Sequence, residues 1–148
     1  MQIFFNGSQG NDIFNYSKFF TDFGGFVNGN RSDRVLNAWT PSNTNTDVPA
    51  LTLSYPSTET NANTYFVEDG SFLRLKNLQI GYTLPTSASS KIGADSVRIY
   101  LQGTNLFTIT DYEGFDPEVV AYGNLDLGID SRLYPISQVF SLGANIKF

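Results

Sequence analysis

The chain has 148 residues, of which 16% are charged and 15% are aromatic, and its formal net charge is −5. Nine Lys and Arg residues are too few for the basic surface that nucleic-acid phosphates require, and the absence of Cys and His excludes a disulfide framework and removes the usual zinc ligands. Many Phe, Tyr, Gly, Asn, Thr and Ser residues favour strands and turns over helices. We therefore expect an all-β protein with no cofactor, no metal and no nucleic-acid partner.

The first half of the chain predicts a strand, a helix and a long loop. Residues 2–8 are typical of a short strand, and the run "NDIFNYSKFF" places Ile13, Tyr16 and Phe20 at helical spacing. From about residue 23 to 63, Asn, Thr, Ser, Gly and Pro dominate. A compact soluble domain rarely contains a loop of ~40 residues, whereas outer-membrane barrels carry long loops on their outer side.

The second half predicts three strands over residues 71–84, 97–109 and 137–148, each with alternating apolar and polar side chains. No apolar run approaches the ~18 residues of a membrane-spanning helix. Asn105 interrupts one apolar side, which indicates either a bulge near Gly103 or a position above the hydrocarbon. The residues expected to face lipid are Leu78, Ile80, Tyr82, Leu84, Val97, Ile99, Leu101, Phe140, Leu142 and Ile146.

The connections between these four strands are long, short and long in chain order. In transmembrane barrels, short inner turns alternate with long outer loops, so this order favours an antiparallel barrel. If the last strand ends on the periplasmic side, "PTSASSKIGAD" is an inner turn and both long loops face outward. The fold class that we expect is all-β and antiparallel, with the strands belonging to a large transmembrane barrel.

Five segments also carry a resemblance to a known family. They are "GNDIFNYSKFF", "RVLNAWTPSNTNTDVPAL", "YFVEDGSFLRLKNLQIGYTLP", "NLFTITDYEGFDPEV" and "GIDSRLYPISQVFSLGANIKF". In this order they resemble the C-terminal end of the SusC/RagA family of TonB-linked outer-membrane proteins, over nearly the whole chain. The resemblance implies that residues 1–148 are the C-terminal segment of a barrel of about 22 strands.

Function and partners follow from the resemblance as expectations. Members of this family sit in the outer membrane and import glycans or peptides, powered through TonB, beneath a SusD-like surface lipoprotein. The plug domain and the part that contacts TonB lie outside this sequence, so we expect the segment alone to transport nothing. The remaining expected partners are outer-membrane lipid and the barrel-assembly machinery, whose recognition signal would include Phe148, the aromatic residue that ends the chain.

Two cations lie at unexpected positions for a lipid-facing side. By simple alternation Arg74 and Lys76 share the side of Leu78 and Ile80. A cation at the bilayer midplane costs ~2–4 kcal/mol, so we expect both to lie near the outer rim, against lipopolysaccharide phosphates. The alternative is a bulge that turns both side chains toward the lumen.

Two features invite a chemical interpretation. Asp111, Glu113, Asp116 and Glu118 are close together in the sequence, but their spacing does not match an EF-hand and no second motif supports hydrolysis. We expect these carboxylates to be solvated or to cap turns, and the protein not to be an enzyme. Trp39, the only Trp, is expected to pack within a loop rather than to stack on a sugar.

An alternative function remains open from the residues alone. A soluble all-β module that binds carbohydrate would show the same alternation, but it would cover its apolar side with a second sheet. A barrel would turn that side to lipid and keep Asn77, Gln79, Gln102 and Asn145 around water.

Overall fold

The computed structural model describes residues 1–23, 30–52, 61–119 and 126–148. The chain divides into two compact units. The sheet unit comprises Met1–Ser8, Phe72–Thr110 and Ile136–Phe148, and the loop unit comprises Gln9–Ser71 and Asp111–Pro135. None of the helices in the described residues is long and apolar enough to cross a membrane.

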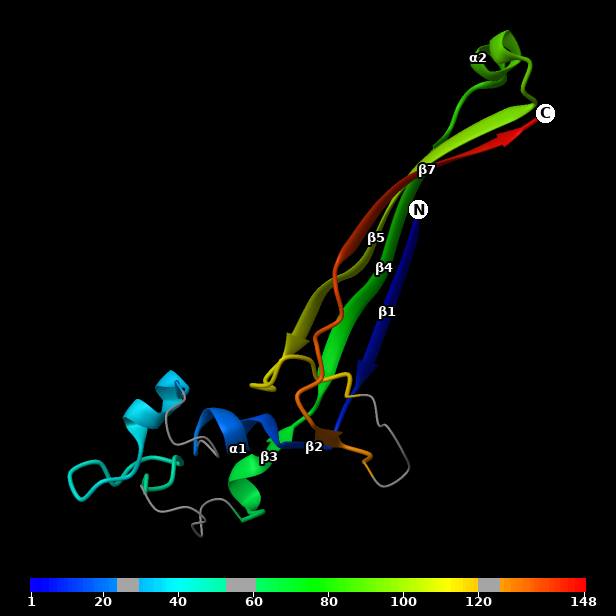
Figure 1. Ribbon diagram of the computed structural model, residues 1–148. Coiled ribbons are helices and arrows are strands. Elements are labelled where there is room, and N and C mark those ends of the chain that lie inside the picture. The colour runs from blue at the N-terminus through cyan, green and yellow to red at the C-terminus, as the bar shows by residue number, and fades with distance from the viewer. Residues whose placement is uncertain (24–29, 53–60, 120–125) are drawn as a thin grey trace. The chain divides into compact units, whose positions relative to one another are not determined.

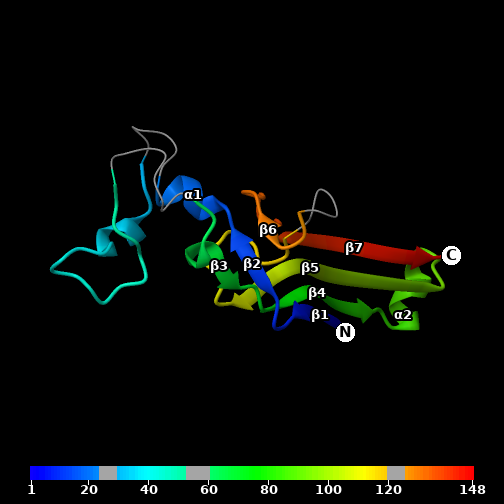
Figure 2. The same cartoon turned by 90° about the horizontal axis from the view of Figure 1, so that it is seen from below.

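The sheet unit is one open antiparallel sheet in the order β1-β4-β5-β7. Its strands are β1 (Gln2–Ser8), β4 (Phe72–Thr83), β5 (Ser96–Thr110) and β7 (Val139–Lys147), which lie side by side in Figures 1 and 2. Each agrees with its predicted range to within two residues at either end. The antiparallel all-β fold is confirmed.

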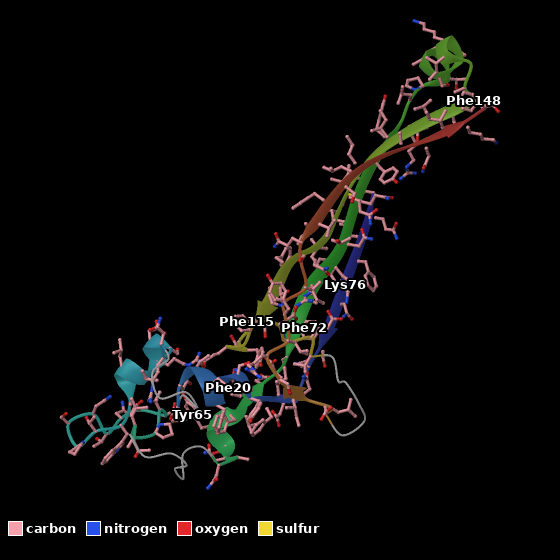
Figure 3. The ribbon with its side chains drawn as sticks, viewed as in Figure 1. Phe20, Tyr65, Phe72, Lys76, Phe115 and Phe148 are labelled. Atoms are coloured by element: carbon pink, nitrogen blue, oxygen red, sulfur yellow. The ribbon has the colours of Figure 1, made fainter. Side chains whose placement is uncertain are left out.

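The two ends of the sheet unit differ in the connections that leave them. Ser8 pairs with Phe72, and Phe72 pairs with Thr110, so both long connections leave from one end of the sheet. At the other end, α2 (Thr86–Ser89) and a 3₁₀ turn, η4 (Ser90–Ile92), join β4 to β5. Figure 3 shows Phe148 at this turn end and Phe72 at the opposite one. The strands therefore have the alternation of long and short connections that the sequence predicts.

A bulge interrupts the sheet about halfway along β4. Asn77 pairs with Thr104 and Leu75 with Phe107, so Lys76 of β4 lies opposite two residues of β5, Asn105 and Leu106. The register to β1 shifts at the same place, between Phe4 and Phe5. Asn105 has a φ of 53°, a left-handed conformation that Asn adopts more readily than most residues. The bulge that the sequence offered as one explanation of Asn105 is therefore present.

The loop unit contains a small sheet of its own, in the order β3-β2-β6. Its strands are β2 (Asp12–Asn15), β3 (Val67–Asp69) and β6 (Ile129–Asp130), with β2 antiparallel to β3 and parallel to β6. Among the described residues, this unit also contains α1 (Ser17–Thr21) and the 3₁₀ turns η1 (Asp33–Asn37) and η3 (Thr64–Phe66).

The helix predicted over "NDIFNYSKFF" is only partly present. Residues 12–15 form a strand in which Ile13 and Asn15 are buried while Asp12 is exposed, so burial there follows a period of two. The helix is confined to Ser17–Thr21. Backbone pairing with β3 and β6 outweighs the local helical spacing of the apolar residues.

The two long connections have a common core within the loop unit. Ile13, Phe23 and Phe66 are buried, and the ring centroids of Phe23 and Phe66 lie 5.9 Å apart in an edge-on arrangement. Tyr112, from the second connection, is also buried in the loop unit. Both long connections therefore contribute buried side chains to the loop unit.

Candidate functional site: a two-sided sheet and a charged cleft

The pairing register assigns every strand residue of the sheet unit to a side, because directly opposed residues share a face. Ile80 pairs with Leu101, and Leu101 with Leu142, in one apolar row across three strands. One position away, Gln79 pairs with Gln102 and Gln102 with Ser141. The amide of Gln79 donates to the side-chain oxygen of Gln102 at 3.3 Å, so the polar row is linked internally.

The apolar row is open to its surroundings. Ile80 and Leu101 are each 54% exposed, and Leu142 is 78% exposed. Soluble proteins rarely leave a contiguous apolar surface of this kind uncovered. The side carries Ile99, Tyr82, Phe140 and Ile146 as well, all exposed.

Three of the ten predicted lipid-facing residues are less open than the others. Leu78 and Leu84 are half-buried, and Val97 is only 6% exposed. The turn that contains α2 packs on the start of β5, and Ser89 and Ala94 are buried there together with Val97. Val97 therefore has the expected strand position, but its side chain is covered rather than open.

The predicted outward position of Arg74 is wrong, because the irregularity at Lys76 reverses the parity of β4. Arg74 pairs with Asn6 and Thr108, on the polar side, and is buried. Its Nε donates to Thr108 Oγ1 at 2.8 Å, and its guanidinium lies 5.7 Å from the Phe72 ring centroid. Simple alternation fails here because Lys76 is an extra residue relative to β1: Asn77 and Leu75 pair with consecutive residues of β1 and so lie on opposite sides.

The loop unit contains a cleft of about 940 Å³ that the sequence did not predict. Its wall is strongly charged but also carries amide, hydroxyl and aromatic groups. The lining residues include Lys18, Arg34, Asp47, Tyr65, Glu68 and Glu113.

Ion pairs form one wall of this cleft. Lys18 Nζ lies 2.7 Å from Glu68 Oε1 and 3.0 Å from Glu113 Oε2, and Arg34 Nη1 lies 3.3 Å from the same Glu113 oxygen. The Lys18 side chain is 7% exposed and that of Glu68 is 11% exposed, so this pair is nearly removed from water. Glu68 is held further by the Asn15 amide at 2.9 Å and the Glu113 backbone N–H at 2.8 Å. The network joins the two long connections of the chain.

Asp22 is a second anchor of the network and is completely buried. Its carboxylate accepts from Arg34 Nε and Nη2 at 3.3 and 3.2 Å and from the Tyr65 hydroxyl at 2.7 Å. Burial, followed by this hydrogen bond to Asp22, raises the pKa of Tyr65. Burial alone would lower the pKa of Arg34, but the hydrogen bond and charge of Asp22, with Glu113, raise it. The arrangement keeps Tyr65 neutral and Arg34 charged.

The acidic segment after β5 has a structural role at two of its residues. Asp116 Oδ1 accepts from the Glu118 backbone N–H at 2.9 Å, which is a turn cap, whereas Glu113 forms the ion pairs described above. Within the described residues, no group of three or more His, Cys, Asp or Glu side chains is arranged to hold a metal ion. Trp39 is 44% exposed, so its role within the loop stays a prediction.

Sequence reasoning missed Lys18, Arg34 and Glu68 of the charged network, and it singled out Glu113 only as part of an acidic run. Lys18, Arg34, Glu68 and Glu113 lie far apart in the chain, and no motif or period links them. A lysine flanked by Ser17 and Phe19 gives no local sign that it will be buried. Only the pairing of β2 with β3 brings Lys18 near Glu68.

Comparisons with known proteins identify the family of the chain, although no protein-family model matches it. The TonB-dependent receptor P3 of Formosa agariphila is 41% identical over the whole chain, and SusC of Bacteroides thetaiotaomicron, also a TonB-dependent receptor, is 32% identical over 70% of it. The RagAB peptide transporter has a TM-score of 0.75 at 35% identity over 99% of the chain. The RagAB peptide importer in its closed-closed state has a TM-score of 0.77.

The chain spans only a small part of these proteins: 15% of receptor P3, 10% of SusC and 15% of the matched RagAB chain. Over that part, both the sequence and the fold agree with theirs. The chain belongs to the SusC/RagA family of TonB-linked outer-membrane proteins.

Proposed function

We propose that the sheet unit is part of the wall of an outer-membrane β-barrel, with its apolar side against lipid and its polar side toward the lumen. The lipid-facing set is the predicted one without Val97, extended by Leu73 and Ile109, which pair with each other beyond the bulge and are exposed. The long connections then lie on the outer side and the turn with α2 on the periplasmic side.

The observation that carries this proposal is the separation of the two sides across paired strands. The row of Ile80, Leu101 and Leu142 is more than half exposed, while the row of Gln79 and Gln102 is linked by hydrogen bonding. A soluble carbohydrate-binding module would need a second sheet over the apolar row. Lipid covers such a surface without further protein.

The whole receptor containing this segment would import a nutrient, either a glycan or a peptide, with energy delivered through TonB. The relatives are named TonB-dependent receptors, and the matched solved structures are of a peptide transporter and importer. By the same relationship, its partners are a SusD-like surface lipoprotein, TonB and the barrel-assembly machinery. The role assigned to the segment is structural, with no catalysis.

Phe148 is proposed as the terminal residue of the assembly signal. It is exposed and follows directly after β7. An aromatic side chain at the turn end suits the membrane interface, where its ring lies at the level of the lipid headgroups.

Spin labels on the full-length receptor in outer-membrane vesicles test the assignment of the two sides. A label at Leu101 should be accessible to oxygen, which concentrates in lipid, and a label at Gln102 to a water-soluble relaxation agent. The reverse pattern would contradict the assignment of sides, and water accessibility at both positions would contradict the barrel wall itself.

A further inference from the structure

One edge of the small sheet in the loop unit is free and lies in the wall of the cleft. β3 is an outer strand in the order β3-β2-β6, and within the described residues it pairs only with β2. All three of its residues, Val67, Glu68 and Asp69, line the cleft. A free strand edge presents main-chain donors and acceptors that can pair with another extended chain.

The pairing of β3 with β2 shows which main-chain groups lie on this edge. Gly70 N–H donates to Asn11 O at 2.8 Å, and main-chain groups alternate in direction along an antiparallel strand. The backbone of Glu68 therefore faces β2, whereas the backbones of Val67 and Asp69 face away from it. Val67 N–H donates into the preceding 3₁₀ turn, η3. Among the described residues, the carbonyl of Val67 and both main-chain groups of Asp69 have no hydrogen-bond partner.

The charges of the cleft wall are unequal once its ion pairs are formed. Lys18 and Arg34, the cations among the described lining residues, already have carboxylate partners. Asp47, Asp69 and Asp111 also line the cleft and are exposed, and none of them forms an ion pair with a described residue. The cleft therefore complements a ligand that carries positive charge.

The same wall offers little to a sugar ring, which packs best on an open aromatic face. Tyr65 is the aromatic residue among the described lining residues, and Lys18 Nζ lies over its ring, 4.8 Å from the centroid. Its hydroxyl is occupied by the hydrogen bond to Asp22. A peptide, by contrast, has the main-chain amides that match the β3 edge. A cleft of about 940 Å³ lies at the upper end of the range of ligand sites, so it has room for several residues.

We propose that the cleft binds an extended stretch of an imported peptide, whose main chain pairs with the free edge of β3. Asp47, Asp69 and Asp111 then select a lysine or arginine side chain on that peptide. The proposal rests on the proposed import function, and it chooses the peptide from the two nutrient classes left open there. Main-chain pairing supplies affinity for any extended peptide, and the carboxylates supply the selectivity.

Isothermal titration calorimetry of the purified full-length receptor tests this proposal with three synthetic probes. The first is the peptide Thr-Lys-Val-Lys-Thr, and the second has Glu in place of both Lys residues. The third is the lysine peptide with its main-chain nitrogens methylated, which removes the main-chain donors but keeps every side chain. We expect the second and third probes each to bind about tenfold more weakly than the first, because ion pairs are lost in one and hydrogen bonds in the other.

A receptor variant places the binding in this cleft. Asp47→Asn, Asp69→Asn and Asp111→Asn together remove three charges but keep the side-chain oxygen that Asp69 offers to Ser71 N–H. This triple variant should bind the lysine and glutamate peptides equally. Asp33→Asn is the matched control, because Asp33 is an exposed carboxylate of the same unit outside the cleft, and it should keep the wild-type preference.

The proposal is overturned if the wild-type receptor binds no peptide, binds the lysine and glutamate peptides equally, or binds the methylated peptide as tightly as its parent. A triple variant that keeps the preference for lysine also overturns it. Binding of maltohexaose, a neutral glucan, in place of any peptide would overturn the proposal but leave nutrient import standing. Spin labels at Leu101 and Gln102 in the same receptor report separately on the barrel wall.

Discussion

The sheet unit and the loop unit differ in which side chains they expose and which they bury. The sheet unit has five basic residues and one acidic residue, and it exposes a continuous apolar row. The loop unit has four basic and thirteen acidic residues, yet it buries Lys18, Asp22 and Asp130. One unit leaves apolar groups uncovered and the other removes charged groups from water.

The difference shows where the stability of each unit comes from. Buried charges are tolerated in the loop unit because each has several partners, as when Asp130 accepts from the Tyr112 hydroxyl at 2.6 Å and from two backbone N–H groups. The exposed apolar row has no such internal compensation, so in the proposed barrel the sheet unit depends on lipid and on neighbouring strands. Substitutions should therefore separate the two units by their effects.

Lys18→Met should destabilise the loop unit by about 3–5 kcal/mol, the cost of leaving a buried carboxylate without its cation. Glu68 would keep the Asn15 amide and the Glu113 backbone N–H but lose its only ion pair among the described residues. Hydrogen exchange in the full-length receptor should rise in β2 and β3 and not in β5. The exposed Lys91→Met is the control and should change neither unit. Equal protection in wild type and Lys18→Met would show that the ion pair does not hold the loop unit together.

Leu101→Arg should produce the opposite pattern. A cation on the lipid side costs ~2–4 kcal/mol near the midplane, so less receptor should be folded in the outer membrane. Gln102→Arg, one position along β5 and on the polar side, should assemble normally. Heat-modifiable migration of the extracted receptor measures the folded fraction. Similar folded fractions for the two variants would mean that the sides of β5 are not chemically distinct.

The strands could be predicted because the alternation of apolar and polar residues is a local signal. Each segment shows it independently of the strands with which it pairs. β5 shows this most clearly, with Ile99 and Leu101 alternating with Tyr100 and Gln102. The same rule failed one strand earlier. Lys76 is an extra residue relative to β1, and nothing in "RLKNL" distinguishes it from a regular position, so simple alternation places Arg74 on the wrong side.

The charged network could not be predicted because its geometry arises from tertiary packing. The acidic run from Asp111 to Glu118 was visible, but Glu113 differs from its neighbours only through Lys18 and Arg34, from the other connection. Burial of Lys18 depends on the pairing of β2 with β3, which sequence periodicity does not specify.

Gly143→Val tests how closely side chains pack on the polar side of the sheet. The new side chain would overlap the Tyr100 ring, which must leave its place at a cost of about 1–3 kcal/mol. Ala144→Val, the next residue and on the apolar side, should be tolerated. Urea unfolding of the receptor in vesicles measures both. Tyr100→Ala should restore most of the loss in the double variant, and an additive double variant would argue against contact between the two positions.

The smallest expected effect is a loss of loop-unit stability in alkali. Burial, and then the hydrogen bond to Asp130, raises the pKa of Tyr112 above its ordinary value of 10.0. The folded unit therefore retains a proton that the unfolded chain releases near that pH, so the contribution is complete below it and declines as the pH rises further. The decline is about 1.4 kcal/mol per pH unit, measurable as faster proteolysis of the loop unit at about pH 11 than at about pH 8.

Tyr112→Phe removes the titrating group and should flatten this pH dependence, whatever it does to the stability at neutral pH. Tyr134→Phe, at an exposed position, should leave the dependence unchanged. If Tyr112→Phe keeps the full loss of stability in alkali, Tyr112 does not cause that loss. Tyr65, whose pKa is also raised by burial and by its hydrogen bond to Asp22, is then the group to test.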